Sequence, residues 1–262
     1  LSRAIRELEE RLGTRLFDRG TTGVSLTEAG RTLMPYARGV AKLLRDAETS
    51  LTRPELPATL RLGLTTSVEP VWFAGLGDRI EAAHPGTSVS TVSDTSPRLV
   101  RQLRGGKLKA AVIALPTEVA GLDVLELDRL PMRVAMPSAH RLARRKVVRL
   151  DDLAGEPVFW FERARQPAFF DHCQQVFTRH RFVPRWLKEP ADHHVLLADV
   201  AHGRGLALLP ASFAGLRRAG VVYRTLAEGD ELAVGVGLAV PVGQRMWRDQ
   251  LVACLGIAGL GK

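Results

Sequence analysis

At three places a predicted strand ends and a predicted helix begins. Two of these places carry hydroxyl side chains, and the third carries a proline and a phenylalanine. Ligands of open α/β sheets bind beyond the carboxyl ends of the strands, and the free N–H groups of a helix N-terminus attract anions. Together, these three places predict a pocket for a small carboxylic acid. The residues concerned are Thr65, Thr66, Ser67, Thr95, Ser96, Pro167, Ala168 and Phe169.

The alternative interpretation of each place, taken singly, is plain helix capping, because Ser and Thr cap helices without any ligand. Three such places at one cleft favour a pocket. Nearby aromatic residues would suit an aromatic acid, although most of them fit a buried core equally well. These aromatic residues are Phe159, Trp160, Phe161, Phe169 and Phe170.

Catalytic and metal-binding motifs are missing from the sequence. It contains no G-x-S-x-G, Walker A, H-E-x-x-H or G-x-G-x-x-G pattern. His193, His194 and His202 have no carboxylate or cysteine at ligand spacing, so we expect them on a helix that borders the cleft. The sequence therefore predicts a protein that is not an enzyme, with no cofactor, no metal and no catalytic residues.

An amphipathic helix and a small hairpin are predicted at residues 1–26. Apolar residues from Leu1 to Leu12 recur on one helical face, and Gly13 is typical of a helix end. Two short extended runs follow around a glycine-containing turn. This order is that of a recognition helix and wing, that is, part of a winged helix-turn-helix.

Residues 27–51 predict a long helix that Thr27 caps. Its apolar residues follow the alternating three-and-four spacing of a helix that pairs with another helix. The alternative is a surface helix packed on its own domain. Two prolines then mark a hinge at 52–58. The apolar seam comprises Ala29, Leu33, Tyr36, Val40, Leu43 and Ala47.

Strands and helices alternate after the hinge, which predicts an open, mostly parallel sheet with helices on both faces. We expect strands near 60–64, 89–93, 110–115, 134–136, 158–161, 206–209 and 232–240. We expect helices near 65–84, 97–104, 167–180, 193–201 and 244–255.

The net charge of +9 in 262 residues gives little evidence of function. Nine basic and seven acidic residues lie among residues 1–51, so most of the excess lies elsewhere. Solvated arginine-rich faces explain that excess better than further phosphate contacts. No run of about 18 apolar residues occurs, and we expect no membrane association. The two cysteines, Cys173 and Cys254, indicate buried, reduced thiols of a cytoplasmic protein.

The first thirty residues resemble the LysR-type transcriptional regulators. The matching motifs are Leu1-Ser2-Arg3, Leu8-Glu9, Leu12-Gly13, Leu16-Phe17, Arg19 and Leu26-Thr27-x-Ala29-Gly30. The segment Gly203–Pro210 is close to a later family motif, whereas Lys109 stands where the family has Asp. Ser67, Ser96 and the turn 167–169 match positions of the family's inducer pocket. The chain also resembles the branch that responds to aromatic and organic acids.

This resemblance implies an α/β fold with a partial winged helix-turn-helix (1–26), a linker and dimerisation helix (27–51) and a two-subdomain effector domain. That domain is similar to type 2 periplasmic binding proteins, with subdomain I at 59–132 and 233–262 and subdomain II at 133–232. It further implies DNA contacts by Ser2, Arg3, Arg6 and Arg19, and dimer contacts by Leu33, Tyr36, Val40 and Leu43. The effector contacts comprise Thr66, Ser67, Thr95, Ser96, Phe161, Pro167, Ala168 and Phe169.

The implied partners are promoter DNA, a small-molecule effector, a second copy of the chain in a homodimer or homotetramer, and RNA polymerase. Two helices precede this point in the family, so we expect the sequence as given to bind DNA poorly. The alternative function is a free-standing solute-binding domain without DNA-binding activity. Effector identity, target promoter and the sign of regulation stay open.

Overall fold

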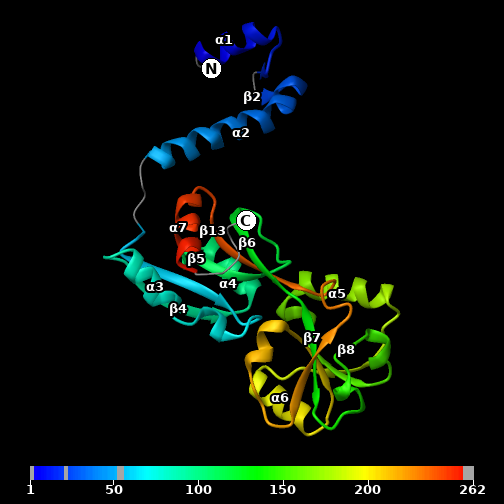
Figure 1. Cartoon of the computed structure of the whole chain (residues 1–262). Coiled ribbons are helices and arrows are strands. Elements are labelled where there is room, and N and C mark those ends of the chain that lie inside the picture. Colours follow the sequence, from blue (N-terminus) through cyan, green and yellow to red (C-terminus); the bar gives the residue numbers. More distant parts are fainter. Residues whose placement is uncertain (1–2, 21–22, 52–55, 256–262) are drawn as a thin grey trace. The chain divides into compact units, whose positions relative to one another are not determined.

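The computed structural model describes residues 3–20, 23–51 and 56–255. The chain divides into two units, Leu1–Pro54 and Glu55–Lys262, which we describe separately (Figure 1). Ser2, one of the predicted DNA contacts, lies outside the described residues, as do the side chains of Arg3 and Arg19.

The first unit contains the predicted helix, hairpin and long helix. Gly13 has φ of 64° directly after the first helix, as expected of a C-terminal glycine. The Glu9 carboxylate accepts hydrogen bonds from the backbone N–H groups of Leu16 and Phe17, which ties the helix to the hairpin. The elements are α1 (Arg3–Leu12), the antiparallel pair β1 (Phe17–Gly20) and β2 (Gly23–Leu26), and α2 (Glu28–Leu51).

The capping residue of α2 is Thr27, as predicted: its Oγ1 accepts from the Gly30 N–H at 3.0 Å. Along α2 the large residues of the predicted seam are exposed. Tyr36 is 70% exposed, Val40 58% and Leu43 69%, while Leu33 is half-buried. The described part of the chain therefore leaves this apolar stripe uncovered.

The second unit contains two lobes, each built on a mixed sheet (Figure 1). The first lobe has a five-stranded sheet in the order β4-β3-β5-β13-β6. Its strands are β3 (Thr59–Thr65), β4 (Ser88–Asp94), β5 (Ala110–Leu115), β6 (Leu122–Leu130) and β13 (Val234–Pro241). Its helices are η1 (Pro70–Phe73), α3 (Leu76–Ala83), α4 (Ser96–Arg104) and α7 (Arg245–Leu255).

The second lobe has a six-stranded sheet in the order β10-β9-β11-β7-β12-β8. Its strands are β7 (Met132–Pro137), β8 (Val147–Val148), β9 (Pro157–Trp160), β10 (Arg185–Lys188), β11 (Leu206–Pro210) and β12 (Val221–Leu226). Its helices are α5 (Pro167–Arg179), α6 (His193–Ala201) and the short turns η2 (Arg141–Arg144), η3 (Leu150–Leu153), η4 (Arg163–Arg165) and η5 (Ala211–Gly215).

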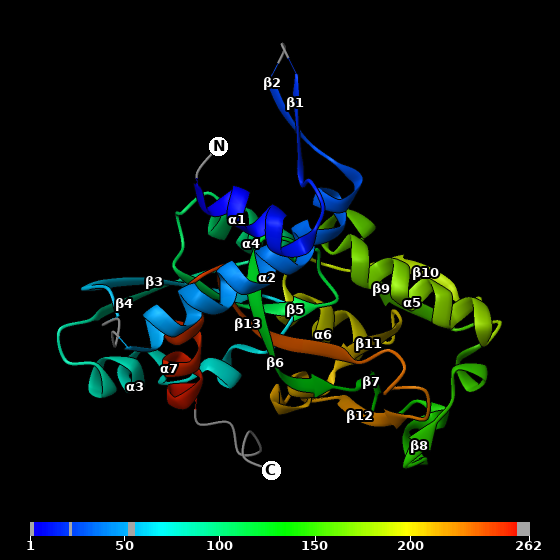
Figure 2. The same ribbon diagram turned by 90° about the horizontal axis from the view of Figure 1, so that it is seen from above.

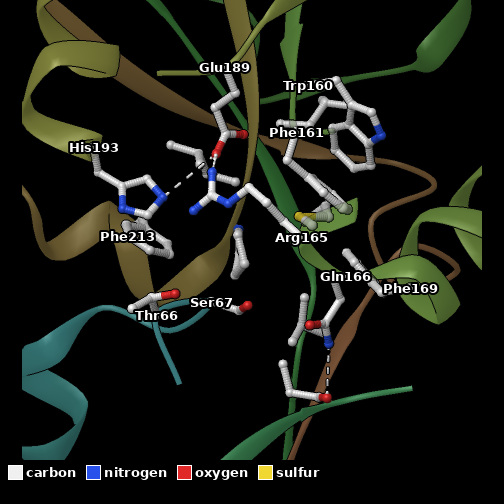
Figure 3. A pocket seen from close by; sticks show the side chains of 16 residues that line it. Thr66, Ser67, Trp160, Phe161, Arg165, Gln166, Phe169, Glu189, His193 and Phe213 are labelled. Carbon is white, nitrogen blue, oxygen red and sulfur yellow. Dashed lines mark hydrogen bonds and ion pairs between the residues drawn. The ribbon is translucent and has the colours of Figure 1, made fainter. Parts of the chain in front are cut away.

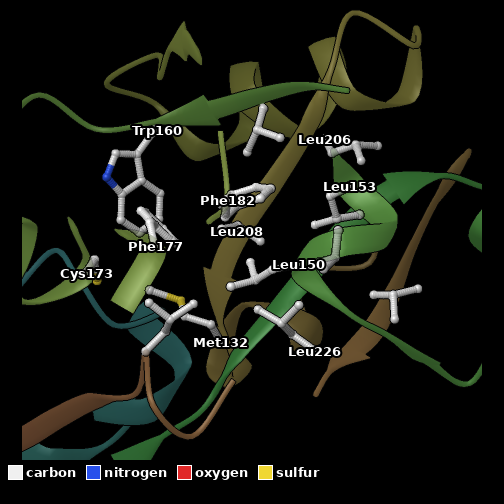
Figure 4. Packing of buried hydrophobic residues seen from close by; sticks show 14 of the residues in the cluster. Met132, Leu150, Leu153, Trp160, Cys173, Phe177, Phe182, Leu206, Leu208 and Leu226 are labelled. Atoms are coloured by element: carbon white, nitrogen blue, oxygen red, sulfur yellow. The ribbon is translucent and has the colours of Figure 1, made fainter. Parts of the chain in front are cut away.

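Helices cover both faces of each sheet because successive strand residues point to opposite sides. In β5, Ala110 and Val112 pack under α3 and α7, while Ala111 and Ile113 pack under α4. Helices α3 and α7 lie against each other in both views (Figures 1 and 2). In the second lobe, α5 and α6 cover opposite faces in the same way. Figure 4 shows the packing on the α5 face, where Phe177 contacts Trp160.

The chain passes between the lobes twice, once from β6 into β7 and once from β12 into β13 (Figure 1). The strand pairs of the two lobes are parallel, as expected, except where β7 and β13 enter the sheets. β13 pairs antiparallel with β5 and β6, and β7 pairs antiparallel with β11 and β12. A strand that re-enters a lobe from the other one runs against the strands laid down by local β-α-β units.

The predicted helix at 65–84 was wrong. Residues 66–69 form a turn, η1 follows, and α3 starts only after Gly75, which has φ of 66°. The left-handed conformation at Gly75 is outside the range of an α-helix, so no continuous helix can run through it.

Candidate functional site

A cavity lies between the two lobes of the second unit, at the carboxyl ends of strands from both sheets. Its inner chamber has a volume of about 60 Å³, and an adjoining outer cleft has about 750 Å³. The two share Thr66, Arg165, His193 and Phe213 as lining residues, so these four form the neck between them. The inner chamber is lined by Thr66, Ser67, Ala114, Met132, Trp160, Phe161, Arg165, Gln166, Phe169, Glu189, His193, Leu208, Leu209, Pro210, Phe213 and Val234 (Figure 3).

Four of the eight predicted effector contacts line this chamber: Thr66, Ser67, Phe161 and Phe169. The other four do not line either space. Pro167 and Ala168 start α5 but contribute no lining surface, and neither does Thr95, the N-cap of α4.

Ser96, predicted as an effector contact, is fully buried inside the first lobe. Its hydroxyl accepts from the Ala114 N–H at 2.8 Å and shares a hydrogen bond of 2.9 Å with Thr65 Oγ1. Both interactions tie α4 and β3 to β5 inside the first lobe. Ser96 thus holds the lobe together beneath the cleft.

The expected helix N-terminus at Ser67 is absent, because the turn 66–69 separates β3 from the short η1. The Ser67 N–H donates to Thr65 Oγ1 at 3.2 Å instead. A positive charge comes to the chamber from Arg165, at the end of η4. The positive charge at the chamber is therefore a guanidinium group, which the sequence analysis did not single out.

Arg165 forms an ion pair with a buried carboxylate that also lines the chamber. Its Nη1 donates to Glu189 Oε1 at 3.2 Å, and His193 Nε2 lies 3.9 Å from the same oxygen (Figure 3). Glu189 follows β10, and its side chain is 7% exposed. His193 opens α6, where its ring lies 4.4 Å from the ring of Phe213.

Burial shifts the pKa values of both titratable partners toward their neutral forms. It raises the pKa of Glu189 from 4.5 to about 7, against the opposing effect of Arg165. It lowers the pKa of His193 from 6.5 to about 4, and the charge of Arg165 adds to that effect. Burial therefore favours a neutral imidazole at His193 and a protonated carboxyl group at Glu189, beside the permanent positive charge of Arg165.

Gln166 connects the two lobes across the cleft. Its Nε2 donates to the Ala114 carbonyl at 3.1 Å and to Thr117 Oγ1 at 2.8 Å, both in the first lobe. A second bridge runs from the Glu69 N–H to Ser212 Oγ at 3.3 Å. Separation of the lobes would break both connections.

Aromatic rings form one wall of the chamber. Phe161 stacks on Phe169 with ring centroids 5.9 Å apart and planes 9° from parallel, and it contacts Trp160 at 4.7 Å. Trp160 and Phe169 are also part of the buried core, as anticipated for most of these aromatics, whereas Phe161 is half-buried.

Sequence reasoning missed Arg165, Gln166 and Glu189 as lining residues, and it placed His193 beside the cleft correctly. Arg165 and Gln166 directly precede Pro167, the predicted helix start, so the turn before that helix was the available signal. No such signal marked Glu189, because nothing in the local sequence distinguishes it from a surface carboxylate.

Both cysteines are buried, Cys173 in α5 and Cys254 in α7. Burial raises the pKa of each thiol. Over residues 3–20, 23–51 and 56–255, no cluster of three or more His, Cys, Asp or Glu side chains could hold a metal ion. In the same part of the chain, no helix is both long and apolar enough to cross a membrane.

Two family models match the sequence. Residues 54–251 match the LysR substrate binding domain, and residues 1–31 match the bacterial regulatory helix-turn-helix protein of the lysR family. The HTH-type transcriptional regulator ShiR of Corynebacterium glutamicum is 31% identical over 212 residues, covering 79% of this chain and 72% of that protein. BenM of Acinetobacter baylyi is 28% identical over 242 residues, covering 88% and 77%.

Another relative is named a probable hydrogen peroxide-inducible genes activator. This protein of Mycobacterium avium is 31% identical over 217 residues, covering 81% of this chain and 68% of that protein. Among solved structures, a full-length OxyR variant from Pseudomonas aeruginosa has a TM-score of 0.65 at 21% identity, covering 96% of this chain and 88% of that chain. Full-length BenM has a TM-score of 0.63 at 22% identity, covering 95% and 84%. At these identities the structural likeness shows the fold alone.

Proposed function

The chain belongs to the LysR family of transcriptional regulators, and from this premise we propose that a small organic acid, bound between the lobes of its second unit, controls DNA binding. The observation that carries the proposal is the cavity at the cleft, which Arg165 lines together with Thr66 and Ser67. A guanidinium group binds a carboxylate through charge-assisted hydrogen bonds. Phe161 and Phe169 offer an apolar wall beside it. This arrangement suits an acid with an apolar body.

The mechanism is a population shift between open and closed lobes. An effector that contacts both lobes binds the closed form more tightly and therefore favours it. Ser67 lies on the first lobe and Arg165 on the second, so one acid in contact with both would add to the bridges made by Gln166 and Ser212.

Peroxide sensing is a second candidate, because some relatives are named as peroxide-inducible activators. Such chemistry needs a thiolate, and thiolates form on accessible cysteines with a depressed pKa. Cys173 and Cys254 are buried, with pKa values that burial raises. Because neither thiol is accessible or readily ionised, an organic acid is the better candidate for the effector than hydrogen peroxide.

The test is calorimetry on the whole chain, after a thermal-shift screen of small aromatic and aliphatic carboxylic acids at pH 6. Because burial raises the pKa of Glu189 to about 7, a lower pH protonates more of this carboxyl group, which then competes less for Arg165. Arg165→Met should weaken the acid that binds best by about ten- to a hundredfold, the value of a hydrogen bond to a charged group.

The matched control is Arg163→Met, two residues away, where the guanidinium is exposed and paired with Asp171. It should leave the affinity unchanged. The proposal fails if no acid binds, or if Arg165→Met and Arg163→Met bind the acid equally well. Stabilisation or inactivation by hydrogen peroxide, without acid binding, would favour the second candidate.

DNA binding by the first unit is proposed on the match of residues 1–31 to the family helix-turn-helix. We assign base contacts to Ser2, Arg3 and Arg6 on or before α1, and a backbone contact to Arg19 on β1. Family membership favours this regulatory role over a free-standing solute-binding domain. Recruitment of RNA polymerase, the domain boundaries and the cytoplasmic location stay predictions.

Pairing of two chains through α2 is proposed on the exposed stripe of Tyr36, Val40 and Leu43, with Leu33 at its start. Large apolar side chains in this register pack against a second helix in a coiled coil. The homodimer or homotetramer predicted from the sequence would use this contact.

A further inference from the structure

The orientation of the Gln166 amide is fixed by its neighbours. The Ala114 carbonyl, 3.1 Å from Nε2, can only accept a hydrogen bond, so the nitrogen must face it. Thr117 Oγ1 at 2.8 Å is compatible with the same orientation. The amide oxygen must therefore point to the other side, and Figure 3 shows it on the side that faces Ser67.

The Gln166 oxygen is buried and has no hydrogen-bond partner among the residues that the structure describes, although Gln166 lines the inner chamber. Gln166 as a whole is 5% exposed. Buried polar atoms in native proteins are nearly always hydrogen-bonded, to protein, water or a bound group, so an unpaired one that lines a chamber is a candidate contact for a ligand. Here the missing partner must be a hydrogen-bond donor.

A simple carboxylate cannot be this donor, because an ionised carboxyl group only accepts hydrogen bonds. The carboxylate has its own partner in Arg165, the residue next to Gln166 in the chain and in the lining. The two adjacent residues thus need different ligand groups: Arg165 needs an anionic hydrogen-bond acceptor, and Gln166 Oε1 needs a neutral hydrogen-bond donor.

We propose that Gln166 determines the specificity of this site, and that the effector is a carboxylic acid carrying a separate hydroxyl or amino group that donates to Gln166 Oε1. This inference rests on the proposed function and sharpens it from acids in general to donor-bearing acids. Since Nε2 of the same amide bridges to β5, the ligand's donor would also hold the residue that links the lobes.

The experiment compares matched pairs of probes on the whole chain by calorimetry at pH 6. One series is benzoate with 2-, 3- and 4-hydroxybenzoate, and the other is butyrate with its 2-, 3- and 4-hydroxy derivatives. In at least one series a hydroxy acid should bind about tenfold or more tightly than its parent, because it pairs a buried acceptor that the parent leaves unpaired.

The side chain introduced by Gln166→Met has a similar length without either polar atom. In this variant the ratio of the affinities for the hydroxy acid and its parent acid should therefore fall close to one. The ratio of the two affinities is the readout, since loss of the bridge to β5 weakens the parent acid and the hydroxy acid alike. Gln175→Met, on the same helix at an exposed position, is the control and should keep the preference.

Failure of this inference and failure of the proposed function look different. If parent and hydroxy acids bind within about twofold of one another, the role of Gln166 is wrong while an acid site at Arg165 stands. A preference that persists in Gln166→Met also overturns the inference. Absence of binding by every acid overturns the proposed function and the inference with it. Should Gln166→Met fail to fold, the comparison of acids on the unaltered chain still decides.

Discussion

Helices α2 and α5 carry apolar stripes of similar spacing and use them differently. In α5, Phe169, Cys173, Val176 and Phe177 are buried against the second sheet. In α2, Tyr36, Val40 and Leu43 are exposed. A periodic apolar pattern therefore indicates that one helix face is to be covered, but not whether the cover comes from the same folding unit. For α5 it does, whereas for α2 we propose a second chain.

The largest effect is expected where the cover is internal. Phe177→Ala removes a fully buried ring that contacts Trp160, Phe182 and Trp186. Truncation of such a ring costs about 3–5 kcal/mol of unfolding free energy, measured by urea denaturation. The equivalent truncation on the α2 stripe, Tyr36→Ala, should cost less than about 1 kcal/mol in a dilute, dissociated sample. Similar losses of unfolding free energy in Phe177→Ala and Tyr36→Ala would show that the stripes of α2 and α5 are covered to the same degree within the chain.

An intermediate effect is expected on assembly. Leu33→Asp with Val40→Asp should weaken chain association by about a hundredfold or more, since each buried apolar side chain contributes about 1.5–3 kcal/mol. Analytical ultracentrifugation should then show smaller particles, with secondary structure unchanged by circular dichroism.

Arg38→Asp is the control for that variant, because position 38 lies on the side of α2 opposite the stripe. It should sediment like the unaltered chain. Unchanged sedimentation of the folded double variant would remove the stripe from the interface between chains.

The smallest effect concerns the pH dependence of stability that Glu189 and His193 cause. Glu189 has a raised pKa of about 7, so its contribution to stability is present below pH 4.5 and is lost as the pH rises through 7. His193 has a lowered pKa of about 4, so its contribution is present above pH 6.5 and is lost as the pH falls through 4. Between pH 4.5 and 6.5 the two slopes oppose each other.

Glu189→Gln removes the contribution of Glu189, so the pH dependence of stability that His193 causes should become visible. Relative to the unaltered chain, the variant should gain about 1 kcal/mol of unfolding free energy per pH unit from pH 4.5 to 7, measured by urea denaturation. Parallel stability curves for the two proteins would show that Glu189 titrates normally.

Local patterns predicted the fold best where one element could be identified from its own residues. The starts of α5 and α6 at Pro167 and His193 and the full extent of β5 were predicted correctly from the local sequence. The short strands β8 and β10, and β6 and β12 along the crossings, were missed. These strands form through partners distant in sequence, which a local pattern does not contain.

The site was predictable in its place and only partly in its chemistry. Strand ends and the helix start at 167–169 located the cleft, and Ser67 and Phe169 do line it. The ion pair of Arg165 with Glu189 joins residues 24 positions apart on different elements. Burial shifts the pKa of Glu189. This burial results from the packing of the lobes and cannot be predicted from the local sequence around Glu189.

The most direct test of the account is a crystal structure of the whole chain with the acid that binds most tightly in calorimetry. We predict electron density for the acid between the lobes, with its carboxylate on the Arg165 guanidinium and its donor group within hydrogen-bond distance of Gln166 Oε1. Density for that acid at another place, with the chamber beside Arg165 lacking it, would contradict the central claim.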